Sequence, residues 1–471
     1  MNLSEELTHP VFQAVGQAAV HRGVRAYAIG GFVRDLLLKR PCKDIDFVCE
    51  GSGIELARAT AQALGVKQVN VYKNFGTAAF KFGGFELEFV GARKESYDRG
   101  SRKPVVEDGT LQDDQNRRDF TINALALSLM PSDFGELVDP FGGLIDLHRG
   151  LIRTPLDPDV TYSDDPLRML RAIRFATQLN FRIDEASLLS ISRNASRLEI
   201  ISFERIHAEL NKIILAQKPS SGFQLLFQTG LLVHFFPEMV ALSGIEVRQG
   251  IAHKDNFIHT LEVLDNVAQH SDDLWLRWAA ILHDIAKPPT KRFHEEHGWT
   301  FHGHEDRGAR MVPKIFKRLK LPLDGKMKFV QKLVLLHLRP IALTKSEITD
   351  SAIRRLLFEA GDDIDALMTL CRADITSKNE SRVKRYLANY EVVLEKLREV
   401  ESKDHVRNFQ PPIAGEEIME IFGIPPSKPI GEIKNGIKEA ILDGIIPNER
   451  EAAYTLMLQL GLERGLRPVA R

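Results

Sequence analysis

The sequence predicts an α+β protein, with a strand-containing domain at its N-terminus and helical domains after it. Between residues 27 and 90, four short strand-like runs, YAIGG, DIDFVC, TAAFKF and FELEFV, surround a helical stretch, GIELARATAQAL. From Asp164 onward, nearly every segment repeats its apolar residues with the period of a helix. Since the chain has 471 residues, it is too long for one core, and roughly three domains of about 150 residues are expected.

We assign four parts to the chain. Residues 1–155 form the strand-containing head, which opens with a helix at 11–21 and closes with the turn-rich DPFGGLIDLHRG. Residues 91–118 within it are polar and glycine-rich, and we expect a long mobile loop there. A helical neck occupies 156–240, a histidine-rich helical domain 241–400, and a shorter helical tail 401–471.

The composition is that of an ordinary soluble protein, with 44% hydrophobic residues, 27% charged residues and a net charge of -1. The three cysteines, Cys42, Cys49 and Cys371, form neither an even set nor a CxxC pair, which argues against disulfides and a cysteine zinc site. The N-terminus lacks the basic and apolar regions of a signal peptide, and no run approaches a membrane span. We therefore expect a cytoplasmic protein without a membrane segment.

A pair of aspartates in the run DIDFVC is the first candidate for a catalytic site. On a strand, Asp44 and Asp46 project from the same face, because the side-chain period is two. Two carboxylates aimed at one point repel each other unless a cation lies between them, and Mg²⁺ is the usual one. Glu88 lies between apolar neighbours in FELEFV and is a candidate third carboxylate facing the metal.

Upstream of these acids, a glycine pair and an arginine have the properties of a phosphate site. Gly30 and Gly31 allow the backbone to approach a phosphate, and Arg34 follows on the next helical turn. Taken alone, the same residues also describe a turn followed by a solvated acidic strand edge. The decision between the two depends on the other motifs of the chain.

Five motifs follow one another over about residues 25–235. They are IGGFVRDLLLKRPCKDIDFV, RRDFTINALA, DPFGGLIDL, DDPLRMLRAIRFATQLNF and ERIHAELNKII. Together, and in this order, they resemble the class II CCA-adding tRNA nucleotidyltransferase and bacterial poly(A) polymerase family. The resemblance implies a polymerase-β-like nucleotidyltransferase palm, with a mixed sheet and helices, followed by an all-helical neck, a body and a tail. The family usually has Glu-Asp where this chain has Asp164-Asp165.

Carried over residue by residue, the resemblance assigns roles to the motif positions. Asp44 and Asp46 would hold two catalytic Mg²⁺ ions, with Asp119 beside the sugar. The nucleotide-binding set would be Gly30, Gly31, Arg34, Arg118, Asn123, Asp165, Arg168 and Arg171. The implied reaction is two-metal phosphoryl transfer, in which an RNA 3′-hydroxyl displaces pyrophosphate.

The spacing of Asp165 and Arg168 suggests how such a site would select bases. Three residues apart on one helix, the two side chains would lie on one face and point at the same base. A carboxylate accepts hydrogen bonds and a guanidinium donates them, which matches the amino group and ring nitrogen of cytosine and adenine. Uracil and guanine present the reverse order and would leave groups unpaired. Taken alone, the pair more often marks a surface salt bridge.

The segments NFIHTLEVL, AAILHDIAK, FHGHEDRGA, LLHLRP and CRADITSKN supply a second constellation, and their order H…HD…D resembles the HD phosphohydrolase superfamily. Imidazoles and carboxylates can hold a divalent metal and polarise a bound water. The resemblance covers about residues 255–375 and implies a metal site for Mn²⁺, Ni²⁺, Co²⁺ or Fe²⁺. Its ligands would be His259, His283, Asp284, His304, His337 and Asp374.

The remaining histidines of this region have simpler interpretations. His253, His294 and His297 are expected to be ordinary core or surface residues, and His302 is left open. Whether the HD site hydrolyses a substrate is also open. Plausible substrates are 2′,3′-cyclic phosphates or phosphomonoesters at damaged RNA ends.

The stretch 310–339 carries nine lysines and arginines against one aspartate, inside a nearly neutral protein. Such a local basic face is what contact with a phosphate backbone requires, although a solvated helix face is the common alternative. The family resemblance favours RNA contact there. It also implies that the body and the tail, including GEIKNGIKEAILDGII, bind the acceptor and TΨC arms of tRNA.

The sequence therefore predicts an enzyme that adds CCA to the 3′ end of tRNA from CTP and ATP, with an appended HD domain and no evident obligate protein partner. A CC-adding, A-adding or poly(A) polymerase remains an alternative, because the head motifs barely separate these activities. An HD metal phosphohydrolase whose head only binds nucleotide or RNA is the alternative from another class.

Overall fold

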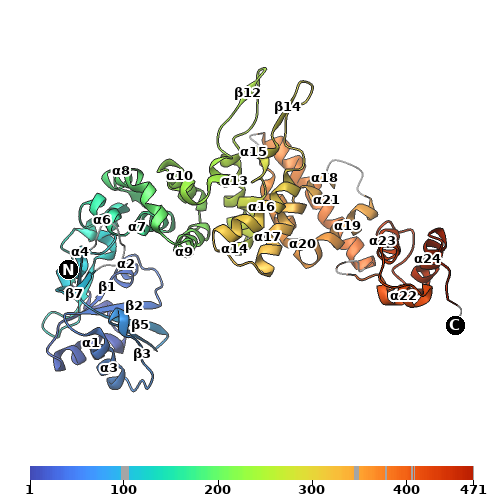
Figure 1. The fold of residues 1–471 in the computed structure, drawn as a ribbon. Coiled ribbons are helices and arrows are strands. Elements are labelled where there is room, and N and C mark those ends of the chain that lie inside the picture. Colours follow the sequence, from blue (N-terminus) through green and yellow to red (C-terminus); the bar gives the residue numbers. More distant parts are fainter. Residues whose placement is uncertain (97–104, 344–348, 377–378, 405–406, 408, 470–471) are drawn as a thin grey trace. The chain divides into compact units, whose positions relative to one another are not determined.

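The computed structural model describes residues 1–96, 105–343, 349–376, 379–404, 407 and 409–469. Two compact units make up the chain, residues 1–240 and residues 241–471 (Figure 1). The predicted α+β organisation is confirmed, because the strands of the large sheet lie in the first unit and the second unit is mainly helical.

The first unit is built around a mixed sheet of seven strands in the order β3-β4-β5-β2-β1-β8-β9. Its strands are β1 Ala26–Ile29, β2 Asp44–Cys49, β3 Asn70–Tyr72, β4 Thr77–Phe82, β5 Phe85–Gly91, β8 Ala126–Ser128 and β9 Leu137–Val138. Strands β2 and β5 pair in parallel, whereas the other neighbours in the sheet are antiparallel.

Alternation along β2 and β5 separates a core face from a polar face. Ile45 and Phe47 of β2 are fully buried in one hydrophobic cluster with Leu87 and Phe89 of β5. The helices α1 Pro10–His21 and α3 Gly53–Ala63 cover this side, and α3 begins at a Ser52 cap. Because successive side chains point to opposite faces, the acidic residues between these apolar ones are left on the other face.

The prediction of a long loop over residues 91–118 is wrong for the described part of this segment. It contains the antiparallel strands β6 Arg93–Ser96 and β7 Val105–Asp108, followed by helix α4 Leu111–Asn116. Thr110 caps α4 with a reciprocal hydrogen bond to Asp113, which stabilises the start of a short polar helix. Residues 97–104 lie outside the described residues.

Helices complete the first unit. They are α2 Gly31–Leu37, α5 Gly143–Arg149, α6 Pro158–Asp164, α7 Leu167–Leu179, α8 Glu185–Asn194, α9 Phe203–Ile214, α10 Pro219–Gln228, α11 Leu232–Phe235 and α12 Pro237–Val240, with the strand pair β10 Leu151–Ile152 and β11 Arg182–Ile183. Helix α7 packs against α9 and α10, and Arg174 of α7 forms a buried ion pair with Glu209 of α9. Helix α7 also carries Arg171 and other residues of the candidate site.

The second unit begins with two hairpins and a group of helices. The hairpins are β12 Val247–Arg248 with β13 Ile251–Ala252, and β14 Arg292–His294 with β15 Gly298–Thr300. The helices are α13 Asn256–Ala268, α14 Leu274–Leu282, α15 Lys287–Thr290, α16 His304–Arg318, α17 Gly325–Leu336, α18 Leu338–Leu343, α19 Asp350–Ala360, α20 Ile364–Asp374 and α21 Glu380–Asp404. Helix α14 packs against α13, α17 and α20 around the buried Trp278.

The last helices of the second unit are α22 Gly415–Phe422, α23 Lys428–Leu442 and α24 Arg450–Glu463. Helix α23 packs against α22, α24 and α19. Across the described residues, no helix has both the length and the apolar character needed to cross a membrane. All three cysteines are free thiols. The boundaries of the four predicted parts stay predictions.

The packing of α1 on the sheet predicts opposite effects of one substitution at two helical glycines. A Cβ atom at Gly16 in α1 would lie 2.1 Å from the carbonyl oxygen of Leu129, whereas a Cβ at Gly431 in α23 would meet nothing within 4 Å. We expect Gly16→Ala to lower the free energy of unfolding by about 1–3 kcal/mol. Gly431→Ala should raise it by up to about 1 kcal/mol. Denaturant titration of both variants checks this, and equal effects would contradict the described contact.

Candidate active site in the head and metal centre in the second unit

Acidic residues gather on the polar face of the large sheet. The parallel register pairs Asp44 with Glu86 and Asp46 with Glu88, so that carboxylates of neighbouring strands share one face. Burial raises the pKa of Asp46 and the pKa of Glu88, and each is raised further by a neighbouring aspartate. Arg118 opposes the shift at Asp46. A divalent cation would relieve this repulsion, which is the chemistry predicted for the site.

Gly30 allows Arg118 to approach these acids. It lies between β1 and α2 with a φ of 80°, and a Cβ there would lie 2.8 Å from Arg118 Nη1 and 3.5 Å from Asp46 Oδ2. A side chain would therefore occupy the space in which the guanidinium lies. Asp114 holds Arg118 from behind, with Nε donating to Oδ2 at 3.1 Å.

A buried network centred on Asp119 positions two further arginines. Arg171 donates from Nε to Asp119 Oδ2 at 2.7 Å, and Asn123 donates from Nδ2 to Asp119 Oδ1 at 3.0 Å. The amide oxygen of Asn123 in turn accepts from Arg34 Nη1 at 2.8 Å. Burial alone would raise the pKa of Asp119, but Arg171 and Asn123 lower it to about 2. The carboxylate therefore stays ionised and anchors the network.

Three guanidinium groups surround the ring of Phe175 on α7. The Cζ atoms of Arg34, Arg171 and Arg174 lie 4.9, 5.4 and 4.1 Å from its centroid. Each distance lies within the usual range of a cation–π contact. Each guanidinium group also forms an ion pair, Arg34 with Asp35, Arg171 with Asp119 and Arg174 with Glu209, and these carboxylates offset the repulsion between the three cations.

A cavity of about 880 Å³ joins the acidic face to the arginines. Its lining is Gly31, Arg34, Asp44, Asp46, Ala79, Glu86, Leu87, Glu88, Arg118, Asp119, Asn123, Arg171, Arg174, Phe175, Gln178 and Lys212. Carboxylates for metal ions and arginines for phosphates thus line one space. This combination suits a nucleoside triphosphate bound with divalent cations.

The second unit contains a buried cluster of histidines and aspartates. His259 Nε2 lies 2.9 Å from Asp374 Oδ1 and 3.4 Å from Asp284 Oδ2. His283 Nε2 lies 3.2 Å from Asp284 Oδ2, and His304 Nε2 lies 3.2 Å from Asp284 Oδ1. His337 completes the cluster, with its Nε2 at 3.3 Å from that of His304. Two groups have metal-site spacing, His259–His283–Asp284 and Asp284–His304–His337.

The imidazoles of this cluster are oriented as metal ligands. In His283, His304 and His337, Nδ1 lies 2.8, 2.8 and 2.7 Å from the carbonyl oxygen three residues earlier. With the proton on Nδ1, each Nε2 presents a lone pair to the cluster centre. His283 Nε2 is buried without a hydrogen-bond partner. These donors fit a divalent metal, and Asp284 belongs to both candidate ligand groups.

The pKa shifts of two histidines indicate that the cluster requires positive charge. Burial disfavours the charged form of His283, but Asp284 and Asp374 raise its pKa to about 10. Burial and the neighbouring His283 lower the pKa of His337 to about 4. Without a metal, a proton on His283 would therefore balance the aspartates, and a bound cation would replace it.

Known protein families match separate segments of the chain, which correspond to the head, the neck and the HD cluster. Residues 26–153 match the poly A polymerase head domain, 180–242 the probable RNA and SrmB-binding site of polymerase A, and 256–378 the HD domain. The multifunctional CCA protein of Nitrosococcus oceani is 35% identical over 64% of this chain and 71% of that protein. The A-adding tRNA nucleotidyltransferase of Deinococcus radiodurans is 32% identical over 73% and 78%. The chain belongs to the tRNA nucleotidyltransferase family.

Other similar proteins differ in their sequence identity to this chain and in the share of each chain that the match covers. The A-adding tRNA nucleotidyltransferase of Aquifex aeolicus is 44% identical over 43% of this chain, but the match spans only 24% of that protein. A solved tRNA nucleotidyltransferase complexed with a primer tRNA and an incoming ATP analog is 27% identical, with a TM-score of 0.58 over 82% of this chain and 99% of that one. A CCA-adding enzyme in its apo form shares the fold at 23% identity, with a TM-score of 0.64 over 98% of this chain and 97% of that one.

Most of the predicted family residues in the head line the one cavity. Gly30 lies beside it through its contact with Arg118, whereas Asp165 and Arg168 are not among the lining residues. The expectation that these two lie on one helix is wrong. Asp165 ends α6 in an extended conformation and Pro166 follows it, so α7 begins only at Leu167.

Asp165 and Arg168 make contacts with different partners. Asp165 Oδ2 accepts from Arg205 at 3.2 Å, and Arg168 Nη2 donates to the carbonyl oxygen of Arg117 at 2.6 Å. Arg168 lines a separate cavity of about 170 Å³ beside Lys94. Their joint contact with one base stays a prediction.

Four side chains of the neck line the large cavity and were not predicted. They are Arg174, Phe175, Gln178 and Lys212. The first three follow Arg171 at intervals of three, four and seven residues on α7. This is the spacing of one helix face, so the sequence pattern indicates that the three residues lie on the same face as Arg171.

The basic stretch over residues 310–339 covers the end of α16, the following turn and α17. Lys314, Lys317, Lys320, Lys326 and Lys328 are exposed there. Glu305 and Asp306 lie in the first turn of α16 at its opposite end. The positive charge is thus local, as an electrostatic contact with nucleic acid requires.

The pKa of Asp119 predicts a pH-dependent contribution to stability. Its pKa of about 2 lies below the ordinary value of 3.8, so the ion pair with Arg171 stabilises the fold above about pH 4 and is lost toward pH 2. We expect Asp119→Asn to lower the free energy of unfolding by about 2 kcal/mol at pH 7 and by much less near pH 2. Denaturant titrations at both values test this, with the exposed Asp108→Asn as the control. A loss that does not depend on pH would contradict the assignment.

Proposed function

We propose that this protein adds C, C and A to the 3′ end of tRNA, using CTP and ATP as donors. The observation that carries the proposal is the single cavity in which Asp44 and Asp46 face Arg34, Arg118 and Arg171. A triphosphate needs cations around its oxygens, and carboxylates supply them by holding metal ions. Family membership supports the reaction, since relatives are named multifunctional CCA protein.

The residues suit an in-line phosphoryl transfer. Asp44 and Asp46, with Glu88 beside them, would hold two Mg²⁺ ions, which polarise the attacking hydroxyl and the phosphate oxygens when bound. Arg34, Arg118 and Arg171 would bind the triphosphate. The RNA 3′-oxygen forms a bond to the α-phosphorus while the bond to the bridging oxygen breaks, and pyrophosphate leaves.

Base selection is the second part of the proposal. We infer that Asp165 and Arg168 read the amino group and the ring nitrogen shared by cytosine and adenine. For this, Asp165 must exchange Arg205 for the base, and Arg168 must exchange the carbonyl oxygen of Arg117. Asp165 lies at the junction between α6 and α7, and Arg168 lies in the first turn of α7, so the two side chains are close in the chain.

The number and the kind of nucleotides added distinguish CCA addition from CC, A and poly(A) addition. A protein that adds only A, such as the proteins named A-adding tRNA nucleotidyltransferase, would incorporate ATP into a tRNA that already ends in CC but would not extend one that lacks CCA. Labelled CTP and ATP, supplied separately and together to tRNA lacking its 3′ end, distinguish CCA, CC, A and poly(A) products. We expect addition of three nucleotides followed by a stop.

A head variant tests the assignment of the metal-binding acids. Asp44→Ala should abolish incorporation of CTP and ATP, because removal of one carboxylate leaves the cations without a ligand. Asp133→Ala is the matched control, since this aspartate lies in the turn between β8 and β9 and pairs with Arg25. Wild-type incorporation by a folded Asp44→Ala chain would overturn the proposal.

We also propose that the exposed lysines of α16 and α17 contact the RNA backbone, together with the tail helices α22–α24. Five exposed lysines within 15 positions, Lys314 to Lys328, supply the charge. Binding through phosphates depends steeply on salt, because counterions are released. The reaction uses soluble substrates in a reducing cytoplasm, which suits three free thiols.

A second activity is proposed for the HD cluster. Its four histidines and two aspartates form a set of nitrogen and oxygen donors that suits Mn²⁺, Ni²⁺, Co²⁺ or Fe²⁺. A metal there would lower the pKa of a bound water. Lys287 pairs with Asp284 and is placed to neutralise a phosphate. We propose hydrolysis of phosphate esters such as 2′,3′-cyclic phosphates at RNA ends.

Metal content tests the HD proposal. Asp284 has an oxygen in both candidate metal groups, so Asp284→Ala should lose the bound metal. His297→Ala is the control, because this histidine is exposed and the contact described for its side chain is with Glu296, outside the cluster. Both variants are loaded with Mn²⁺, freed of excess metal and measured by elemental analysis. Equal metal in the two variants would refute the assigned ligands.

A further inference from the structure

The imidazole of His259 differs from the other three imidazoles of the HD cluster in what its Nδ1 atom contacts. In His283, His304 and His337, this atom faces the carbonyl oxygen three residues earlier in the chain. In His259, it lies 2.9 Å from the side-chain hydroxyl oxygen of Thr376, 117 residues later. A carbonyl oxygen only accepts hydrogen bonds, whereas a hydroxyl can donate or accept one. The orientation of His259 therefore depends on a side chain from another part of the chain.

Thr376 and the cluster residue Asp374 belong to one tight turn. Helix α20 ends at Asp374, and Ile375 follows with φ of -72° and ψ of 83°. The amide of Thr376 donates to the carbonyl oxygen of Asp374 at 2.8 Å, which is the hydrogen bond of an inverse γ-turn. The side chains on either side of Ile375 then contact the two nitrogens of His259. Asp374 Oδ1 lies 2.9 Å from Nε2, and Thr376 Oγ1 lies 2.9 Å from Nδ1.

The hydrogen-bonding capacity of these groups explains why a hydroxyl suits this position. Without a metal, carboxylate oxygens of Asp374 and Asp284 lie 2.9 and 3.4 Å from His259 Nε2 and only accept, so Nε2 carries a proton. A ring that binds a metal through Nε2 has no proton there and, when neutral, carries its proton on Nδ1. The hydroxyl of Thr376 can accept this proton, and it can donate to Nδ1 when the metal is absent.

Two contacts tie this turn to α13, the helix that carries His259. Asn266 donates from Nδ2 to the carbonyl oxygen of Ala373 at 2.9 Å. Lys254, just before α13, donates from Nζ to the carbonyl oxygen of Thr376 at 3.0 Å. The backbone of the turn is therefore held by partners other than His259. Loss of the Thr376 hydroxyl would remove one contact of the ring and leave these backbone contacts in place.

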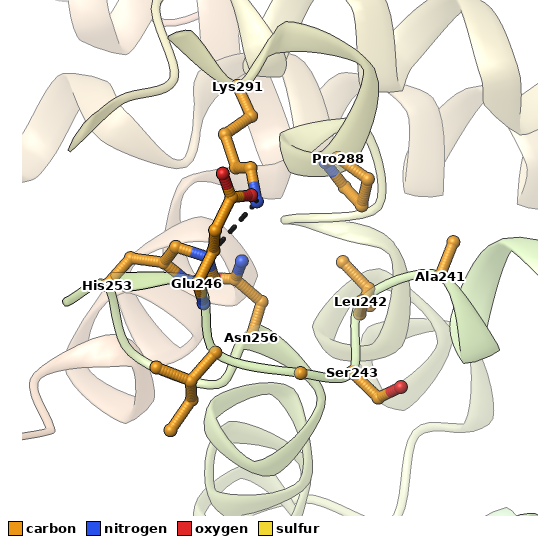
Figure 2. Close-up of a pocket in the computed structure, with 10 residues that line it drawn as sticks. Ala241, Leu242, Ser243, Glu246, His253, Asn256, Pro288 and Lys291 are labelled. Atoms are coloured by element: carbon orange, nitrogen blue, oxygen red, sulfur yellow. Dashed lines mark hydrogen bonds and ion pairs between the residues drawn. The ribbon is translucent and has the colours of Figure 1, made fainter. Parts of the chain in front are cut away.

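The segment that contains Lys254 also lines a cavity of about 250 Å³ at the base of the two hairpins. His253 and Asn256 line it together with Glu246 and Lys291 (Figure 2). Lys291 pairs with Glu246 and lies 3.2 Å from His253 Nε2. The four lining residues are outside both candidate ligand groups of the HD cluster. A change at Glu246 thus alters the surroundings of this segment without altering the cluster.

We propose that Thr376 is a positioning residue of the HD metal centre, and that its hydroxyl holds Nδ1 of His259 while Nε2 serves as a metal ligand. The inference rests on the metal centre proposed above and adds a residue that sets its metal affinity. Groups that orient a ligating histidine fix the ring and its proton, and their loss typically weakens metal binding about 10–100-fold.

Binding of Mn²⁺ to the metal-free full-length chain tests this role. Free Mn²⁺ is measured by electron paramagnetic resonance during the titration, and binding that Asp284→Ala lacks is assigned to the HD cluster. We expect Thr376→Val and Thr376→Ala to bind this Mn²⁺ about 10–100-fold more weakly than the wild type, because Nδ1 loses its partner. Thr376→Ser keeps the hydroxyl and should bind within about twofold of the wild type.

Two matched variants control for the loss of a hydroxyl and for changes near α13. Thr369→Val removes a hydroxyl of α20 that donates to the carbonyl oxygen of Asp365. Glu246→Ala removes the exposed ion pair with Lys291. Both should bind Mn²⁺ as the wild type does, and circular dichroism should show the same helical content in every variant.

The outcomes separate the role of Thr376 from the existence of the metal centre. Wild-type affinity for Mn²⁺ in folded Thr376→Val or Thr376→Ala overturns the positioning role. An equal loss of affinity in Thr376→Ser and Thr376→Val also overturns it, because the hydroxyl would then be irrelevant. A wild-type chain that binds no more Mn²⁺ than Asp284→Ala overturns the HD metal centre on which the inference rests.

Discussion

The parallel pairing of β2 with β5 is the contact on which the head site depends. It brings Asp44 and Asp46 alongside Glu86 and Glu88 on one face of the sheet, while the residues between them fill the core on the other face. Burial raises the pKa of Asp46 and of Glu88, and a neighbouring aspartate raises each of them further. Positive charge beside the acids lowers this cost, and Arg118 supplies some of it.

The opposite wall is held by another buried carboxylate. Asp119 joins Arg171 on α7 to Asn123, and Asn123 joins Arg34 on α2, so that one anion orients cations from two helices. Both guanidinium groups also contact the ring of Phe175. The cations of this wall are therefore already oriented, and such preorganisation is a main source of stabilisation in the phosphoryl transfer that we propose for the cavity.

Residue patterns predicted the parts of this site that depend on local periodicity. The alternation in DIDFVC and FELEFV was enough to place Asp44, Asp46 and Glu88 on a common polar face, but not to reveal which strands pair. Pro166 itself marks the break that separates Asp165 from the helix of Arg168, since the residue before a proline avoids the helical conformation. The spacing of Arg174 and Phe175 places them on the same helix face as Arg171. It does not show that this face points into the cavity, so the sequence alone did not assign them to the site.

The HD cluster obeys the same electrostatic constraint with different ligands. In the head, Asp44 is exposed and Asp46 is partly buried on one face of the sheet. In the second unit, Asp284 and Asp374 lie among buried imidazoles, where an uncompensated anion is far more costly. A proton on His283 balances this charge when no metal is bound. Positive charge at the HD cluster therefore comes from within its own set of residues, whereas in the head it lies on the arginines that line the same cavity as the acids.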